Sequence, residues 1–244
     1  MELPEALRRL VPAGEFVLSD EGDGEPAFWL SDEPADPGLW PRLRAAHGEF
    51  GYWPLLLGAD DDDGAPWATG EVFPDGKTTP ADHDPTTLLR EWWRLYAKEA
   101  PPFGDAWPAP ARQADPDAAA DSLAEELLAK NPAMRLGLVA AGSGAEALAA
   151  SGWDGPANYT NDTGEIAAVV RDWERRYGVR VVALDGYATL YLSVSAPPAD
   201  REQVGHLAAE HFAFCPDNIW QGAGTLATYA EQLAGATFWT FWWD

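Results

Sequence analysis

The sequence predicts an α+β fold with a mainly antiparallel sheet and helices packed against it. The elements expected after residue 133 follow the order strand, helices, hairpin, helices, strand, which is a βαββαβ-like order of ferredoxin-like character. The final segment, TFWTFWWD, places aromatic side chains on both faces of a strand and therefore predicts burial on both sides. We expect the N-terminal half to cover the face of the sheet that the helices leave open.

The first region, residues 1–110, is expected to be α+β and rich in loops. A short helix is predicted over 2–11, and the strands EFVLSD and PAFWLSD flank the acidic turn EGDGE. LWPRLRAAHGEFG suits a helix that stops near Gly51, and YWPLLLG is an apolar run typical of a buried strand. TTLLREWWRLYAKEA predicts a helix with a wide apolar face.

The second region, residues 111–132, is expected to hold a linker and a helix. The stretch 100–120 is rich in Pro, Ala and Asp, a composition typical of a semi-rigid connection. A helix is predicted from Asp121 or Ser122 to the stop signal Asn131-Pro132.

The third region, residues 133–244, has the clearest pattern. RLGLVAA predicts a strand, SGAEALAAS a helix, and DTGE at 162–165 resembles a capping box that starts a helix ended by Gly178. VRVVAL and ATLYLSVS around DGY predict a hairpin. Two more helices, from about Asp200 to Cys215 and from Thr225 to Leu233, precede the final strand. The three regions are expected to form one compact body.

The composition limits which classes of protein the chain can belong to. The chain has 244 residues, of which 46% are apolar, so it can bury a sizeable core. No run resembles a secretory signal or a membrane span, so no membrane association is expected. The one cysteine excludes an internal disulfide and fits a reducing compartment, which predicts a cytoplasmic location. No cofactor is expected, because no phosphate loop, dinucleotide fingerprint or zinc-ligand spacing occurs.

The net charge of −24 argues against nucleic acid as a partner, since phosphate contacts need clustered Lys and Arg. One interpretation is an acidic face that meets a basic protein and steers its association. The alternative is a compositional bias toward Ala, Gly, Pro, Asp and Arg, in which the acidity serves mainly solubility.

HFAFCPDNIW, residues 211–220, contains the most tempting catalytic pattern. His211 and Cys215 are four residues apart, so they lie on one stripe of a helix and could act as base and nucleophile, with Asp217 nearby. However, Cys215 ends the helix, where the helix dipole disfavours a thiolate, and no lysine or arginine follows His206. The pattern therefore favours a structural role for both residues, and no catalytic residue is assigned.

Two loops offer a candidate binding site. SGWDGPANYTND and CPDNIWQGAG each place one tryptophan among Gly, Asp and Asn residues. If the loops at 152–162 and 215–224 converge, they would form a small pocket with an aromatic floor and polar edges. Its predicted residues are Trp153, Asn158, Asn161, Asp162, Asp217, Asn218, Trp220 and Gln221.

No metal site is expected. ADDDDG at 59–64 fails as a calcium loop, because Ala59 and Gly70 stand where acidic ligands are needed, and four adjacent carboxylates are typical of a solvated loop. ADHDP sets His83 between Asp82 and Asp84, and it suits a loop that precedes a capped helix better than a metal cluster.

GWDGPANYTND, AAEHFAFCPDNIWQG and the final FWWD together resemble the bacterial family catalogued as domain of unknown function 4253, over roughly residues 135–244. WLSD and YWPLLLG are similar to the upstream segment often found in such proteins. The resemblance implies a bacterial, usually stand-alone protein and carries over no assigned activity.

These observations favour a non-catalytic binding or interaction protein, such as an acidic or immunity-type partner that neutralises a basic target. Two alternatives stay open. One is a hydrolase or transferase that uses Cys215 with His211 and Asp217. The other is a small-molecule or carbohydrate-binding protein that uses the loops at 152–162 and 215–224.

Overall fold

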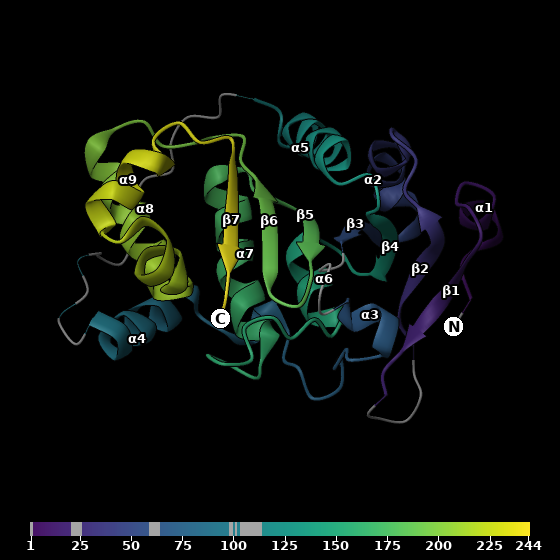
Figure 1. The fold of residues 1–244 in the computed structure, drawn as a ribbon, viewed down its shortest axis with the longest axis horizontal. Coiled ribbons are helices and arrows are strands. Elements are labelled where there is room, and N and C mark those ends of the chain that lie inside the picture. The colour runs from purple at the N-terminus through teal and green to yellow at the C-terminus, as the bar shows by residue number, and fades with distance from the viewer. Residues whose placement is uncertain (1, 21–25, 59–63, 98–99, 101, 103–113) are drawn as a thin grey trace.

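The fold was analysed in a computed structural model, which describes residues 2–20, 26–58, 64–97, 100, 102 and 114–244. A seven-stranded sheet runs across the molecule, and helices lie on both of its faces (Figure 1). Residues 60–63 of the acidic run, and residues 103–113 of the expected linker, lie outside the described residues.

The strand order is β1-β2-β4-β3-β5-β6-β7. The strands are β1 (Gly14–Leu18), β2 (Pro26–Pro34), β3 (Tyr52–Gly58), β4 (Arg135–Ala140), β5 (Arg180–Asp185), β6 (Thr189–Ser193) and β7 (Phe238–Trp242). β3 and β5 pair in parallel near the centre, whereas the other neighbours pair antiparallel. The sheet is thus mixed, which corrects the expectation of a mainly antiparallel one.

The ferredoxin-like detail is not confirmed, because a strand from the first region divides the expected domain. β3 lies between β4 and β5, pairing Leu56 with both Leu136 and Ala183. The N-terminal half therefore contributes strands to the sheet as well as covering it. Local periodicity predicts a buried strand at 52–58, but it holds no information about which strands lie beside it.

The helices of the first two regions differ from the expected ranges mainly at their ends. Their bounds are α1 (Glu5–Arg8), α2 (Leu39–Phe50), α3 (Pro66–Thr69), the 3-10 turn η1 (Pro80–Asp82), α4 (Pro85–Ala97) and α5 (Pro116–Lys130). Helix α5 begins earlier than predicted, because the Asp115 side chain accepts hydrogen bonds from the amides of Asp117 and Ala118 and Pro116 fits the first helical position.

The α-helices of the third region begin and end close to the predicted residues, whereas a π-helical turn occupies most of the expected loop at 215–224. They are α6 (Gly144–Ala150), α7 (Thr163–Tyr177), α8 (Arg201–Phe214), the π-helical turn η2 (Asn218–Ala223) and α9 (Leu226–Leu233). Asp162 caps α7 and Asp200 caps α8 through their side chains, and Gly178 ends α7 with a φ of 59°. In the described part of the chain, no helix is long and apolar enough to cross a bilayer.

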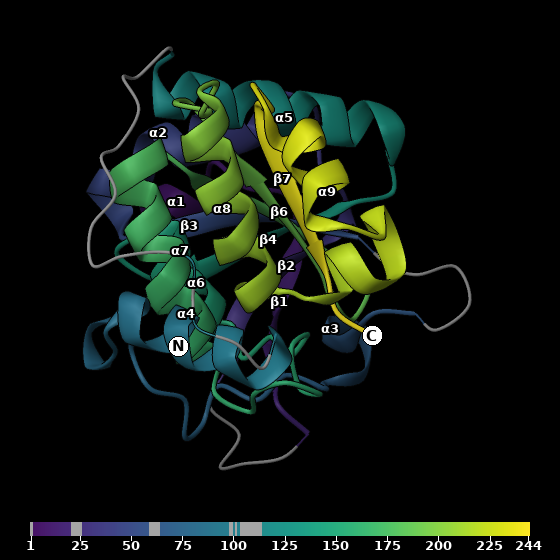
Figure 2. The same ribbon diagram turned by 90° about the vertical axis from the view of Figure 1, so that its left-hand side faces the viewer.

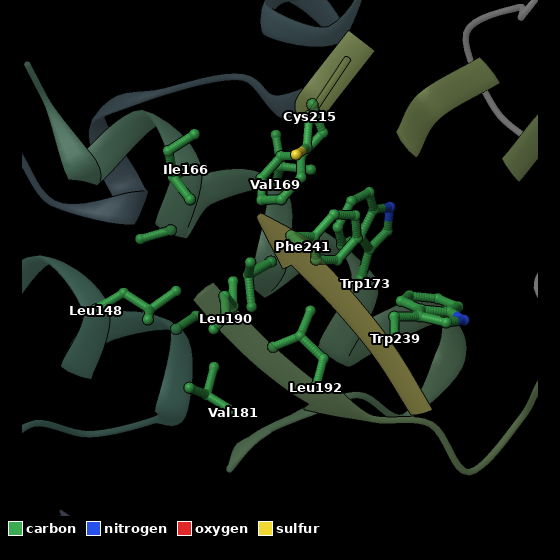
Figure 3. Packing of buried hydrophobic residues seen from close by; sticks show 14 of the residues in the cluster. Leu148, Ile166, Val169, Trp173, Val181, Leu190, Leu192, Cys215, Trp239 and Phe241 are labelled. Atoms are coloured by element: carbon green, nitrogen blue, oxygen red, sulfur yellow. The ribbon is translucent and has the colours of Figure 1, made fainter. Parts of the chain in front are cut away.

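Two hydrophobic clusters occupy the two faces of the sheet. One includes residues of α4, α6, α7, α8 and α9, and the other includes residues of α1, α2 and α5. Figure 1 shows α2 and α5 together, apart from α8 and α9, and Figure 2 shows α9 beside β7. In the larger cluster, Trp173 of α7 stacks on Phe241 of β7 with ring centroids 5.5 Å apart (Figure 3).

The final strand is buried on one face only, which corrects the expectation of burial on both sides. Trp239, Phe241 and Trp243 are at most 2% exposed, whereas Phe238 is 38% and Trp242 is 42% exposed. The reason is the position of β7 at the edge of the sheet, while α5 packs on the inner strands β5 and β6. An aromatic pattern on both faces therefore marks an edge strand with an exposed aromatic face.

Candidate functional site

His211 and Cys215 do not form a catalytic pair. Both side chains are fully buried in the larger hydrophobic cluster, where Figure 3 shows Cys215 among apolar side chains. His211 Nδ1 lies 3.0 Å from the hydroxyl of Tyr229, and its Nε2 has no hydrogen-bond partner within the described residues. The Cys215 thiol instead donates to the carbonyl oxygen of Trp242 at 3.0 Å.

Burial also removes the charge states that a thiolate mechanism needs. Burial raises the pKa of the Cys215 thiol to about 12 and lowers the pKa of His211 to about 3. At neutral pH the pair therefore consists of a neutral thiol and a neutral imidazole. A reactive cysteine has the opposite properties, namely partial exposure and a lowered pKa.

The segment after α8 holds the outer edge of β7. In an antiparallel ladder, alternate residues direct their backbone groups toward the same neighbour. Thr237 O accepts from Val194 N and Trp243 N donates to Ala188 O, so the odd-numbered residues of this stretch face β6. The backbone groups of Thr240, Trp242 and Asp244 consequently point away from the sheet.

Side chains from residues 215–218 meet these outward groups. Asn218 Nδ2 donates to Thr240 O at 2.7 Å, and Asn218 Oδ1 accepts from Trp242 N at 3.2 Å. Cys215 Sγ donates to Trp242 O, and Asp217 Oδ2 accepts from Asp244 N at 3.1 Å. The Asn218 amide thus makes the two contacts that the N–H and the C=O of one residue would make in a neighbouring parallel strand. We call Cys215, Asp217 and Asn218 the β7 latch.

The two predicted loops converge, and they meet at the end of β7. Tyr159 donates its hydroxyl to Asp217 Oδ2 at 2.7 Å, which joins the loops directly. Asn158 Nδ2 donates to Asp244 O at 2.8 Å, and Gln221 Nε2 donates to both Asp217 Oδ1 and Asp244 Oδ2. These contacts satisfy the carboxylate of Asp217, which is only 2% exposed. Four of the predicted polar residues therefore bind the protein's own C-terminal segment, namely Asn158, Asp217, Asn218 and Gln221.

The two loop tryptophans do not share a pocket floor. Trp153 is 1% exposed, donates from Nε1 to Tyr187 O at 2.8 Å, and packs edge-on against Trp243. Trp220 is 54% exposed and contacts Tyr96 and Phe212. The remaining predicted residues, Asn161 and Asp162, belong to a different contact.

Asn161 and Asp162 fasten the loop to the segment before α4. Lys77 Nζ donates to Asn161 O at 2.5 Å and pairs with Asp154 at 2.8 Å. Asp162 accepts from the amide and the hydroxyl of Thr78, at 3.0 and 2.7 Å, while it caps α7. These hydrogen bonds lower the pKa of Asp162 against the opposing effect of burial.

The ADHDP segment behaves as a loop before a capped helix. Asp82 accepts from the backbone amide and hydroxyl of Thr79, and Asp84 Oδ1 accepts from Thr87 N at 2.7 Å in the first turn of α4. His83 Nε2 contacts the Thr78 hydroxyl and lies 3.6 Å from Asp162. Across the described residues, no group of three or more His, Cys, Asp or Glu side chains is arranged to hold a metal ion.

A cleft of about 810 Å³ opens beside the converged loops. Its carboxylates come from four separate segments, and its aromatic side chains come from three. The acidic residues are Asp20, Glu71, Asp154 and Asp244, and the aromatic residues are Phe73, Tyr187, Trp242 and Trp243. Trp242 is the exposed aromatic of β7, so the cleft combines negative charge with an accessible ring.

Sequence reasoning missed most of this cleft. Asp20 and Glu71 are brought together because Asp20 N donates to Gly70 O at 3.0 Å, a contact that no spacing predicts. Phe73 is fixed by its amide, which donates to Gly152 O at 2.7 Å. Gly152 has a φ of +71°, and a Cβ there would lie 2.4 Å from Pro74 N. The available signals were the predicted loop at 152–162, which contributes Asn158 to the lining, and the DGY hairpin turn, which carries Tyr187.

Comparison with known proteins finds a family match that covers part of the chain. No curated protein and no solved structure gives a significant match. The model of the family described as "Domain of unknown function (DUF4253)" matches residues 135–244, the stretch that contains the β7 latch, both converging loops and β7 itself. The chain is therefore similar to the DUF4253 family over residues 135–244.

Proposed function

We propose that this protein is a non-catalytic binding protein and that its partner is a basic protein, which inserts a positively charged side chain into the cleft. The observation that carries the proposal is the meeting of three carboxylates, those of Asp20, Glu71 and Asp244, with the exposed ring of Trp242 in one cleft, where a fourth, Asp154, is already paired with Lys77. A guanidinium or ammonium group gains from both features, because carboxylates pair with it and an aromatic face attracts it.

The charge of the whole chain supports the same partner. Forty acidic residues against sixteen basic ones give the net charge of −24, which attracts a basic protein over a distance and repels nucleic acid. The single cysteine is buried and free, which fits a reducing compartment, and we propose a cytoplasmic location on this ground. The thiol-dependent hydrolase or transferase is not proposed, because burial keeps Cys215 protonated.

A fluorescently labelled peptide of four arginines is a direct probe of the cleft. Fluorescence anisotropy should show binding that weakens as salt rises. The double variant Asp20→Asn, Glu71→Gln removes two carboxylates from the cleft, and we expect its affinity to fall about tenfold, or about 1.4 kcal/mol. The control, Glu91→Gln with Glu231→Gln, removes the same charge from exposed positions on α4 and α9.

The control variant distinguishes binding in the cleft from attraction of the peptide by the total negative charge of the chain. Equal losses in the two double variants would mean that the peptide senses only the total charge, and the cleft would then not be the site. Binding of a neutral sugar in a parallel thermal-shift screen, without binding of the peptide, would replace the basic partner with the carbohydrate-binding alternative.

A further inference from the structure

We propose that the β7 latch is a positioning device for the cleft: Cys215, Asp217 and Asn218 take the place of an eighth strand and fix the wall that Trp242, Trp243 and Asp244 form. This inference concerns residues that line the cleft. It rests on the proposed function only in treating the wall as part of a binding site. The contacts of the latch lie within the chain, so the latch can be tested by itself.

The pairing covers consecutive outward groups of the strand. From Thr240 O through Trp242 N and Trp242 O to Asp244 N, each outward group has a side-chain partner in the latch. A sheet edge with open backbone groups is free to move or to pair with another chain. The latch closes this edge at the same residues that line the cleft.

The latch is itself anchored on two sides, which gives it a defined position. Asn218 Nδ2 also donates to the Tyr229 hydroxyl of α9 at 3.1 Å, and that hydroxyl lies 3.0 Å from His211 Nδ1. Asp217 accepts from Tyr159 of the other loop. The buried His211 therefore supports the latch through Tyr229, a role that requires no titration or catalysis.

The latch also explains why the two most distinctive segments of the third region belong together. CPDN supplies side-chain groups at 215–218, and FWWD at 241–244 supplies the outward backbone groups of Trp242 and Asp244 that they meet. Without CPDN these backbone groups would lose their side-chain partners, and unpaired groups at a partly buried edge are costly.

Amide hydrogen exchange measured by NMR tests the latch on the full chain without ligand. Asn218→Asp keeps the size of the side chain but turns the donor toward Thr240 O into an acceptor, and Asn218→Ala removes both contacts. We expect the Trp242 amide to exchange at least tenfold faster in Asn218→Ala, which loses its acceptor, and faster also in Asn218→Asp, in which repulsion from Thr240 O opposes the contact, while the amide of Phe241, which faces β6, keeps its protection. Asn131→Asp makes the same chemical change at the end of α5 and should alter neither amide.

The pattern of protection decides the outcome. Three results would each overturn the latch as a local device. They are fast exchange of the Trp242 amide in the unsubstituted protein, unchanged exchange of this amide in both Asn218 variants, and an equal loss of protection at the Trp242 and Phe241 amides. The arginine peptide is then titrated against Asn218→Asp, and a weaker affinity is expected if the wall is displaced. Failure of the unsubstituted protein to bind the peptide would refute the proposed function and leave the exchange result on the latch standing.

Discussion

Glu174 of α7 gives the sharpest test of the electrostatics of this fold. Its carboxylate accepts from Ala145 N at 3.1 Å, at the start of α6, and burial raises its pKa to about 7 against an ordinary value of 4.5. The folded protein therefore binds a proton at Glu174 that the unfolded chain has already lost between about pH 4.5 and 7. The contribution of Glu174 to stability is fully present below pH 4.5 and is lost as pH rises through 7.

The size of the effect follows from the shift. A difference of about 2.5 pKa units at about 1.4 kcal/mol per unit corresponds to roughly 3 kcal/mol. Glu174→Gln keeps an oxygen that accepts from Ala145 N and cannot ionise. We expect the variant to match the unsubstituted protein at pH 4.5 and to be more stable by up to about 3 kcal/mol at pH 8.

Urea denaturation at half-unit steps from pH 4.5 to 8 measures this difference. The subtraction cancels the repulsion among the other carboxylates, which is the same in both proteins. A difference in unfolding free energy that stays constant across the range would refute the assignment of a raised pKa to Glu174. Glu126→Gln, which removes one carboxylate from an exposed position on α5, is the control.

Two further predictions concern buried groups. Arg176→Met removes the guanidinium that lies 2.6 Å from the carboxylate of Glu210, which is only 4% exposed. We expect urea denaturation to show a loss of about 3–5 kcal/mol of stability, because the buried charge loses its permanently charged partner. Arg175→Met is the matched control, since its pair with Asp172 is exposed, and a loss as large there would contradict the role of burial. Cys215 should react slowly with iodoacetamide at pH 7 and rapidly in denaturant; fast labelling of the folded protein would contradict the raised thiol pKa.

Much of the secondary structure follows from local chemistry. The caps at Asp162 and Asp200, the stop at Gly178 and the hairpin of β5 and β6 all rest on interactions within a few residues, so the sequence predicts them closely. The insertion of β3 between β4 and β5 is not predictable in this way, because an apolar run specifies burial without specifying a neighbour.

The candidate site, like the fold, could be predicted from the sequence only in part. Polar residues in two loops predict a meeting point, and the contact of Tyr159 with Asp217 agrees with it. What they bind could not be predicted, since the Asn218 amide pairs with backbone groups twenty-two and twenty-four residues away. The acidic cleft draws on Asp20 and Glu71, whose proximity exists only in three dimensions.

The place of β3 has a consequence for where this protein can be divided. A fragment of residues 135–244 would keep β4, β5, β6 and β7 but lose the strand that joins β4 to β5. Two inner strands would then become open edges, with Leu136 and Ala183 facing a missing neighbour. The stretch that defines the family is therefore a unit of sequence rather than a unit of folding, and any chain that folds it in the same way must supply the central strand from outside it.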